Sequence, residues 1–227
     1  MRKYFKYFLH LYVFIGYSLS SAGSYDDFIA AVTFDQPATI EKLLARGFDP
    51  NTPNEKGDAG ILVALQSASP QSAMLLAKHP KTNLNAQNKA GETPLMLAAI
   101  NNQLALAKVL IDRGADVNKP GWTPLHYAAT RGHRDMMRLL LDNDAYIDSE
   151  ASDGTTPLML AARFAPPLAT KLLLEEGADP TLVNQQNASA LDLALKNDRQ
   201  QAAFYIRVFT ESWFIQNPTV DETPTPK

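Results

Sequence analysis

Apolar residues recur along this chain with helical spacing, in pairs of short segments separated by polar turns. In the clearest pair, residues 122–142, Leu125 shares one helix face with Ala128 and Ala129. After Gly132 a second apolar run follows, made of Met136, Met137, Leu139, Leu140 and Leu141. Helices this short are not stable alone in water, so each pair is predicted to stack against another. Because Met136 and Met137 are adjacent, both are expected in or near the core, with at most one pointing fully inward.

Helix-start signals recur at a regular interval. Thr123 is a good N-cap residue, because its hydroxyl accepts a hydrogen bond from a free amide, and Pro124 suits the first helical position. The equivalent positions lie 34, 30, 33 and 33 residues apart and are occupied by Ala59, Thr93, Thr123, Thr156 and Ser189. The chain is therefore predicted to be a repeat protein with a period near 33 residues.

Three motifs in the same phase carry a family resemblance: Thr-Pro-Leu-His at 123–126, Gly-His at 132–133 and Arg-Gly-Ala-Asp-Val-Asn at 113–118. They resemble the ankyrin repeat, and the period is typical of it. The resemblance implies an all-α ankyrin-repeat solenoid of about six helix–turn–helix units with short hairpin-like loops. We expect this domain over residues 25–215, with degenerate units at its N-terminal end, because end repeats need a polar outer face.

Some positions depart from the regular repeat. Gly60 stands where other units have proline, which predicts a looser helix start. Only two residues separate Asn118 from Gly121, where the neighbouring units have five. The finger that the family projects at this place is therefore expected to be shorter by three residues. The last helix is expected over residues 199–212, with residues 213–214 folding back as a C-terminal cap.

Both ends of the chain differ from the repeats. Residues 1–22 combine a basic start, the apolar run 8–15 and a small residue, Ala22, suited to cleavage, which is the pattern of a secretory signal peptide. The apolar run is well short of the roughly 20 residues that span a bilayer, so we expect export, most simply to a periplasm, with removal of this segment. Residues 216–227 contain three prolines and little apolar content, which predicts a disordered tail.

Charge narrows the choice of partners. The chain has 21 Lys and Arg residues against 24 Asp and Glu residues. The first 22 residues contain three basic and no acidic residues, so the remainder holds 18 against 24, a net charge of −6. Nucleic acid and anionic membranes both require a positive face and are therefore not expected as partners.

The sequence holds no recognisable catalytic or metal-binding pattern. Cysteine is absent, no two histidines have the spacing of a zinc helix, and there is no nucleophile elbow or phosphate loop. The family resemblance implies that His126 braces neighbouring repeats. Loop carboxylates such as Asp148 and Asp179 are expected to accept hydrogen bonds from backbone amides. We therefore expect no enzymatic activity, no cofactor and no metal.

The resemblance also implies where a partner would bind. In ankyrin repeats the residue before the Thr-Pro pair and the two residues at the end of the first helix vary and point outward. By phase, the candidate partner-binding residues are Phe34, Gln66, Ile100, Asn101, Trp122, Thr130, Arg131, Arg163 and Phe164. Aromatic and Arg side chains dominate interface energetics. Trp122 is either such an anchor or a filler of the gap beside the short loop, and Phe164 is either an anchor or packs on Pro166 or Pro167.

These features predict an exported, monomeric, non-enzymatic protein-binding module whose concave face, centred on Trp122 and Arg131, holds, stabilises or inhibits a partner protein. One alternative is a small-ligand-binding or enzymatic protein that uses a notch at the shortened 119–121 loop. That alternative requires a cavity with converging polar groups near Lys119, Trp122 and His126. The other alternative is a membrane-tethered scaffold that keeps its N-terminal segment.

Overall fold

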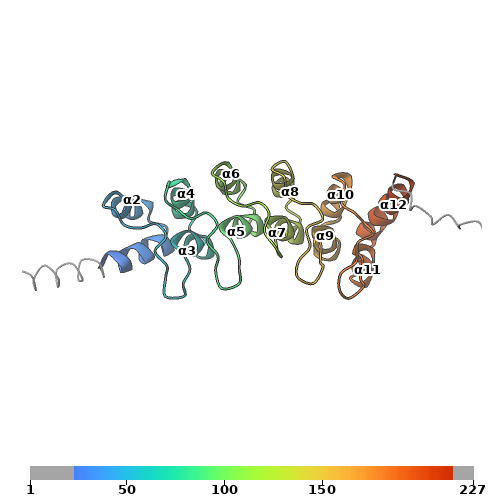
Figure 1. Cartoon of the computed structure of the whole chain (residues 1–227), viewed down its shortest axis with the longest axis horizontal. Helices are drawn as coiled ribbons and strands as arrows, with labels where there is room; N and C mark the ends of the chain where they lie inside the picture. The colour runs from blue at the N-terminus through green and yellow to red at the C-terminus, as the bar shows by residue number, and fades with distance from the viewer. Residues whose placement is uncertain (1–22, 217–227) are drawn as a thin grey trace, which may run out of the picture. The chain divides into compact units, whose positions relative to one another are not determined.

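The computed structural model describes residues 23–216, and within them the regular structure is helical. Residues 23–33 are helical, and the later helices are α2 (Pro37–Ala45), α3 (Gly60–Gln66), α4 (Pro70–Lys78), α5 (Pro94–Ile100), α6 (Leu104–Asp112), α7 (Pro124–Arg131), α8 (Arg134–Leu141), α9 (Pro157–Phe164), α10 (Pro167–Glu175), α11 (Ala190–Lys196) and α12 (Gln200–Gln216) (Figure 1). The predicted all-α succession of helix pairs is confirmed. The predicted signal peptide, and the predicted tail apart from residue 216, lie outside the described residues.

The chain divides into two compact units, residues 1–97 with 112–115 and residues 98–111 with 116–227. In unit 1 the helix over residues 23–33 and helices α2, α3 and α4 surround a core that includes Phe28, Ile61 and Leu76, each fully buried. Gly60 lies in this core, where an added Cβ would meet the Phe28 ring at 2.8 Å. The missing side chain at residue 60 therefore lets the ring pack against the start of α3.

Unit 2 repeats one helix pair along its length. Figure 1 shows α7, α9 and α11 in one row and α8, α10 and α12 in a second row. Within each row consecutive helices come from successive repeats, and α7 contacts α9 as α9 contacts α11. The predicted helix starts are confirmed, since Thr123, Thr156 and Ser189 are the N-cap residues of α7, α9 and α11.

The expectation that Met136 and Met137 both lie in or near the core is confirmed, but the expectation that at most one of them points fully inward is wrong. Met136 and Met137 are both fully buried in α8, together with Leu140. Adjacent residues on a helix diverge by about 100°, so both are buried only when the helix is covered around more than a quarter of its circumference. Stacking of repeats on both sides of a helix pair provides such coverage, which a pattern within one repeat does not reveal.

The connecting loops confirm the shortened finger. In four loops a backbone amide donates across a tight turn to a carbonyl four residues later: Asn54 to Asp58 at 2.9 Å, Asn88 to Glu92 at 3.1 Å, Ala151 to Thr155 at 2.9 Å and Asn184 to Ala188 at 3.1 Å. Residues 120–122 form only a bend. The loop before α7 is thus shorter, as its two-residue spacing predicted.

The last helix is longer than predicted. α12 runs from Gln200 to Gln216, so the chain does not fold back after residue 212. No Gly or Pro interrupts this segment before Pro218, which explains why the helix continues. None of the described helices is both long enough and apolar enough to cross a membrane.

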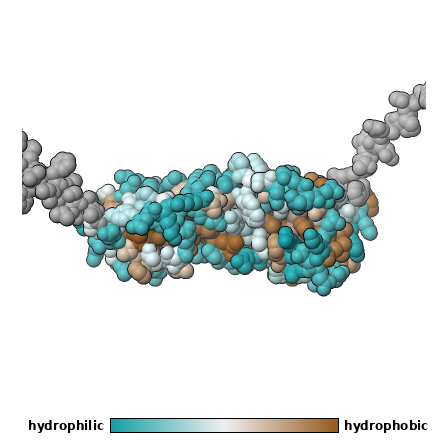
Figure 2. Space-filling view, turned by 90° about the horizontal axis from the view of Figure 1, so that it is seen from below, coloured by the Kyte–Doolittle hydropathy of each residue, from teal (hydrophilic) through white to brown (hydrophobic). Residues whose placement is uncertain are grey.

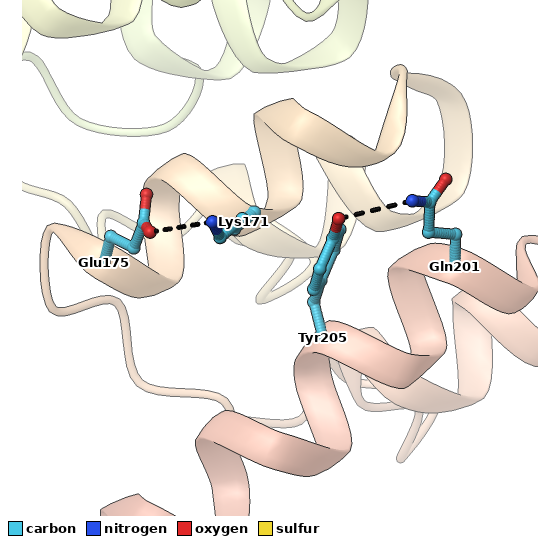
Figure 3. Close-up of polar contacts among 4 residues, drawn as sticks. All are labelled: Lys171, Glu175, Gln201 and Tyr205. Carbon is cyan, nitrogen blue, oxygen red and sulfur yellow. Dashed lines mark hydrogen bonds and ion pairs between the residues drawn. The ribbon is translucent and has the colours of Figure 1, made fainter.

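Helix α12 packs against α10, and each helix carries a polar contact of its own beside the place where they meet. Figure 3 shows Lys171 of α10 paired with Glu175 at 3.2 Å, while Gln201 of α12 donates to the Tyr205 hydroxyl at 3.2 Å. The Lys171 ammonium also lies 5.9 Å from the centre of the Tyr205 ring, a cation–π contact between the two helices. Of these three contacts, the cation–π contact is the one that links the final helix to the preceding repeat.

Candidate binding surface

Four consecutive turns of unit 2 lie side by side, and direct contacts show it. The His133 ring Nε2 lies 3.1 Å from the carbonyl oxygen of Ile100, which joins the turn after α7 to the end of α5. A Cβ added to Gly132 would lie 2.6 Å from Cδ of Pro166, so the turns after α7 and α9 are in contact. The Arg199 guanidinium donates to the carbonyl of Ala165, which joins the turns after α9 and α11. We call residues 100–103, 130–135, 163–167 and 196–200 the turn edge.

Six of the nine predicted binding residues lie on the turn edge. They are Ile100, Asn101, Thr130, Arg131, Arg163 and Phe164, and none of them is buried. The ring of Phe164 is half exposed, so it does not pack fully onto the prolines that follow it. Lys196 and Asn197, both exposed, also lie on this edge, although they are not among the nine predicted residues; the same phase counted from Ser189 identifies them.

Trp122 lies at the other end of α7. The eight residues of that helix separate Trp122 from Arg131 by about 12 Å, so the two do not form one cluster. The Trp122 ring packs against His126 at a centroid distance of 5.5 Å, with the ring planes tilted by 44°, and meets Tyr127 edge-on at 5.4 Å, while 40% of the residue stays exposed. It therefore covers the space beside the short loop and still presents an aromatic surface.

Phe34 and Gln66 belong to unit 1. Both are exposed, and Phe34 is the more accessible at 71%. The neighbouring turns are joined by the Ser69 hydroxyl, which donates to the Thr33 carbonyl at 2.9 Å. Unit 1 thus repeats the arrangement of the turn edge, with exposed residues at the ends of successive first helices.

Exposed apolar area does not by itself distinguish the turn edge. On α12, Phe204, Val208 and Ile215 are spaced to share one helix face and are exposed by 59%, 44% and 81%. In the view of Figure 2, hydrophobic residues reach the surface as separate patches between hydrophilic ones. The property that sets the turn edge apart is its charge.

The turn edge contains five basic and two acidic residues, in a chain with an acidic excess. Arg131, Arg163 and Lys196 occupy the last turns of α7, α9 and α11, where the partial negative charge of a helix end favours cations. The Arg163 guanidinium also lies 4.7 Å above the centre of the Phe164 ring. Within residues 23–216 none of these three cations forms an ion pair.

The opposite end of α9 is acidic. Residues 148–155, which lead into α9, contain Asp148, Glu150 and Asp153 and no basic residue. Asp148 accepts a hydrogen bond from the backbone amide of Asp179 at 3.1 Å, and Asp179 accepts one from that of Thr181 at 2.7 Å, as predicted for loop carboxylates. Helix α9 therefore has a cation, Arg163, at one end, on the turn edge, and carboxylates at the other.

His126 has the bracing role that the resemblance implied. Its Nδ1 accepts from the Thr123 amide at 3.1 Å, and its Nε2 lies 3.0 Å from the Thr155 carbonyl of the next repeat. Burial lowers the pKa of this imidazole below its usual value. Both ring nitrogens thus have hydrogen-bond partners within the fold. Across residues 23–216 no group of three His, Asp or Glu side chains is placed to hold a metal ion.

Two adjoining grooves lie in unit 1, between α2 and α4. One, of about 590 Å³, is lined by residues that include Pro37, Met74 and Leu75, and the other, of about 410 Å³, by residues that include Leu44 and Leu75. Glu41 and Lys78 line both grooves. Neither lining includes Lys119, Trp122 or His126, the residues required by the notch alternative.

A family model described as ankyrin repeats (3 copies) matches residues 28–120, 61–153 and 117–184. Ankyrin repeat and SAM domain-containing protein 6 of Rattus norvegicus is 34% identical over 146 residues, which cover 64% of this chain and 13% of that protein. The NF-kappa-B p105 subunit of Gallus gallus is 31% identical over 175 residues, 74% of this chain and 18% of that protein. This chain therefore spans less than a fifth of the length of these two curated relatives.

Two solved structures share the fold. An ankyrin repeat domain from Acinetobacter baumannii superposes with a TM-score of 0.70 at 23% identity, covering 80% of this chain and 96% of that one. A chain from the structure of a predatory endopeptidase from Bdellovibrio bacteriovorus in complex with an immunity protein also gives a TM-score of 0.70, at 26% identity, and covers 80% of this chain and 97% of that one.

Proposed function

Because this chain belongs to the ankyrin repeat family, we propose that it works as a binding module for one partner protein and that the turn edge of unit 2 forms part of the contact surface. Ankyrin repeats are protein-interaction modules, and stacked repeats present extended surfaces suited to such contacts. The observation that carries the proposal is the row of exposed side chains on contiguous turns. It includes Arg131, Arg163 and Phe164, residue types that are enriched at the energetic centres of interfaces.

We place the partner in an exported compartment. The basic start, short apolar run and small residues of segment 1–22 support this placement. Mass measurement of the chain isolated from its host tests it. A species that begins near residue 23 supports export with cleavage, whereas a full-length species in the membrane fraction favours a tethered scaffold.

The role we propose is restraint of an exported enzyme. The similarity to a chain from a complex between an endopeptidase and an immunity protein supports inhibition over stabilisation of the partner. We further propose that the chain is a monomer without catalytic activity of its own. The packing of Trp122 against His126 and Tyr127, which takes up space beside the short loop, supports this choice over the notch alternative.

The test is affinity capture from the host's exported fraction with mass-spectrometric identification. Bait proteins are the wild-type chain, the Arg131→Ala/Phe164→Ala variant and a control, Lys42→Ala/Lys78→Ala, which removes exposed lysines from helix ends of unit 1. Each is first shown to be folded by circular dichroism. A protein captured by wild type and control but lost with the turn-edge variant supports the proposal. Equal capture by all three places the contact elsewhere.

The captured protein is then assayed for activity with and without this chain. Loss of its enzymatic activity on binding supports restraint. An increase in its activity or in its thermal midpoint instead supports stabilisation. Failure of wild type to capture any exported protein contradicts the proposed function.

A further inference from the structure

Three cations recur once per repeat along the turn edge, and none of them forms an ion pair within residues 23–216. Arg131, Arg163 and Lys196 lie at the ends of α7, α9 and α11, which are neighbours in successive repeats. Packed helices lie about 8–10 Å apart, so the helix ends that carry the three cations form a row with roughly that spacing. The contacts of Gly132 with Pro166 and of Arg199 with Ala165 hold the turns together and so fix the row.

Few carboxylates oppose these cations on the turn edge. Asp135 faces Arg138 at 3.8 Å, and Asp198 accepts a hydrogen bond from Gln200 at 3.0 Å. The ion pairs among the described residues leave Arg131, Arg163 and Lys196 unpaired. Arg163 also rests on the Phe164 ring, which orders the guanidinium while leaving donors at its rim for a carboxylate.

The spacing of this row selects one kind of ligand backbone. In a polyproline II helix every third residue returns to the same face, with a repeat of about 9.3 Å. In a β-strand the same-face repeat is about 6.6 Å, which does not match helix spacing. A polyproline II segment with Asp or Glu at every third residue would therefore place one carboxylate opposite each cation.

We propose that the turn edge of unit 2 binds an acidic, extended segment of the partner protein, with carboxylates at every third residue facing Arg131, Arg163 and Lys196. The inference rests on the proposed protein-binding function and adds the chemistry of the bound segment. Phe164, half exposed at the centre of the row, contacts an apolar side chain of the segment between the carboxylates. The acidic residues 148–155 at the opposite end of α9 repel the segment, which favours its binding at the turn edge.

The probe is a fluorescein-labelled peptide of five Glu-Pro-Thr repeats, titrated with the full chain and followed by anisotropy. One comparison peptide has Gln in place of Glu, and another has the same composition with its Glu residues contiguous. We expect the first peptide to bind, the Gln peptide not to bind and the contiguous peptide to bind more weakly. Raising the ionic strength from about 0.05 to 0.5 M should weaken binding, because exposed charges are screened.

The variant Arg131→Gln/Arg163→Gln/Lys196→Gln removes the row. If each exposed pair contributes a factor of about two to five, its loss should weaken peptide binding about tenfold or more. The matched control, Lys42→Gln/Lys56→Gln/Lys78→Gln, removes the same net charge from exposed lysines of unit 1. It should bind the peptide about as well as wild type, because those lysines lie outside the turn edge. Equal weakening in both variants overturns the inference.

Other outcomes also overturn it. These are equal affinity for the regular and contiguous Glu peptides, tighter binding of a 15-nucleotide single-stranded DNA than of the peptide, or self-association of the chain that the turn-edge variant abolishes. The two proposals fail separately. If the Glu-Pro-Thr peptide does not bind but an exported protein is still captured, the binding function stands and the acidic segment is wrong.

Discussion

The Nε2 atom of His126 lies 3.0 Å from the carbonyl oxygen of Thr155, so one imidazole joins two consecutive repeats. On the other side of the ring, Nδ1 accepts from the Thr123 backbone amide, and an amide only donates. Nδ1 is therefore unprotonated and Nε2 carries the hydrogen that it donates to Thr155. The brace requires a neutral imidazole, in agreement with burial lowering the pKa of His126.

Stability should depend on pH through His126. Its pKa is about 6.5 in the unfolded chain and lower in the folded one, so the unfolded state binds more protons between the two values. Stability is then fully present above about pH 6.5 and is lost as pH falls through the folded-state pKa. Urea unfolding midpoints from pH 8 to pH 5 measure this loss.

The variant His126→Gln isolates the contribution, because wild type and variant share His79 and His133. Its unfolding free energy at pH 8 should be lower than that of wild type by about 1–3 kcal/mol, because hydrogen bonds are lost at a buried site. The gap between wild type and variant should narrow toward pH 5. A constant gap across this range would show that His126 does not titrate on unfolding.

Asp148→Asn should stabilise the protein at neutral pH. In the preceding repeat Asn118 fills the equivalent position: its amide donates to the Asp144 carbonyl at 2.7 Å and its oxygen accepts from the Tyr146 amide at 2.8 Å. Asp148 only accepts, from the Asp179 amide. Burial, together with the charge of Asp179, raises the pKa of Asp148 above its usual value, so the ionised carboxylate is disfavoured in the fold.

The raised pKa of Asp148 determines how the stability of the protein changes with pH. The folded state binds more protons than the unfolded state from about pH 4 up to the folded-state pKa, so stability falls as pH rises through this window. Asn removes the penalty and should raise the unfolding free energy at pH 7 by about 0.5–1.5 kcal/mol. Chemical denaturation at pH 7 and pH 4 is the measurement, with the exposed Asp142→Asn as control. A gain equal at both pH values would argue against the charge as its cause.

Gly132→Ala should destabilise the protein more than Gly177→Ala. Both glycines have positive φ, 70° and 95°, which costs another residue about 1–2 kcal/mol. Only at Gly132 does the added Cβ meet a neighbour, the Pro166 ring at 2.6 Å, whereas at Gly177 it meets nothing within 4 Å. The clash should add about 1–3 kcal/mol, measured as the difference between the two thermal-unfolding midpoints. Equal losses would mean that the turns after α7 and α9 are not in contact.

Leu140→Ala should cost about 2–5 kcal/mol, because the side chain is fully buried in α8 and its removal leaves a cavity. Leu139→Ala is the comparison, since Leu139 is the adjacent residue and is not fully buried. Leu139→Ala should lower the unfolding free energy by less than Leu140→Ala does. An unchanged unfolding midpoint for Leu140→Ala would contradict the phase of the repeats.

The helix starts could be predicted because their causes lie within a few residues. The N-cap hydroxyl of Thr156 accepts from the amide three residues later, and a proline follows at the first helical position, so sequence spacing alone indicates the boundary. The phase of the repeat then identified the outward positions at the ends of the first helices. The end of the last helix was missed, because capping signals are weak there and the helix continues toward the next proline at 218.

By itself the sequence determined the repeat, its period, the order of helices and the short loop before α7, since each depends on local spacing. Only the tertiary structure decided which turns touch. His133 reaches Ile100, 33 residues away, and Arg199 reaches Ala165, 34 residues away. It likewise decided that both Met136 and Met137 are buried and that the cations of three repeats form one row. Such contacts depend on how one repeat packs on the next, which no pattern within a single repeat specifies.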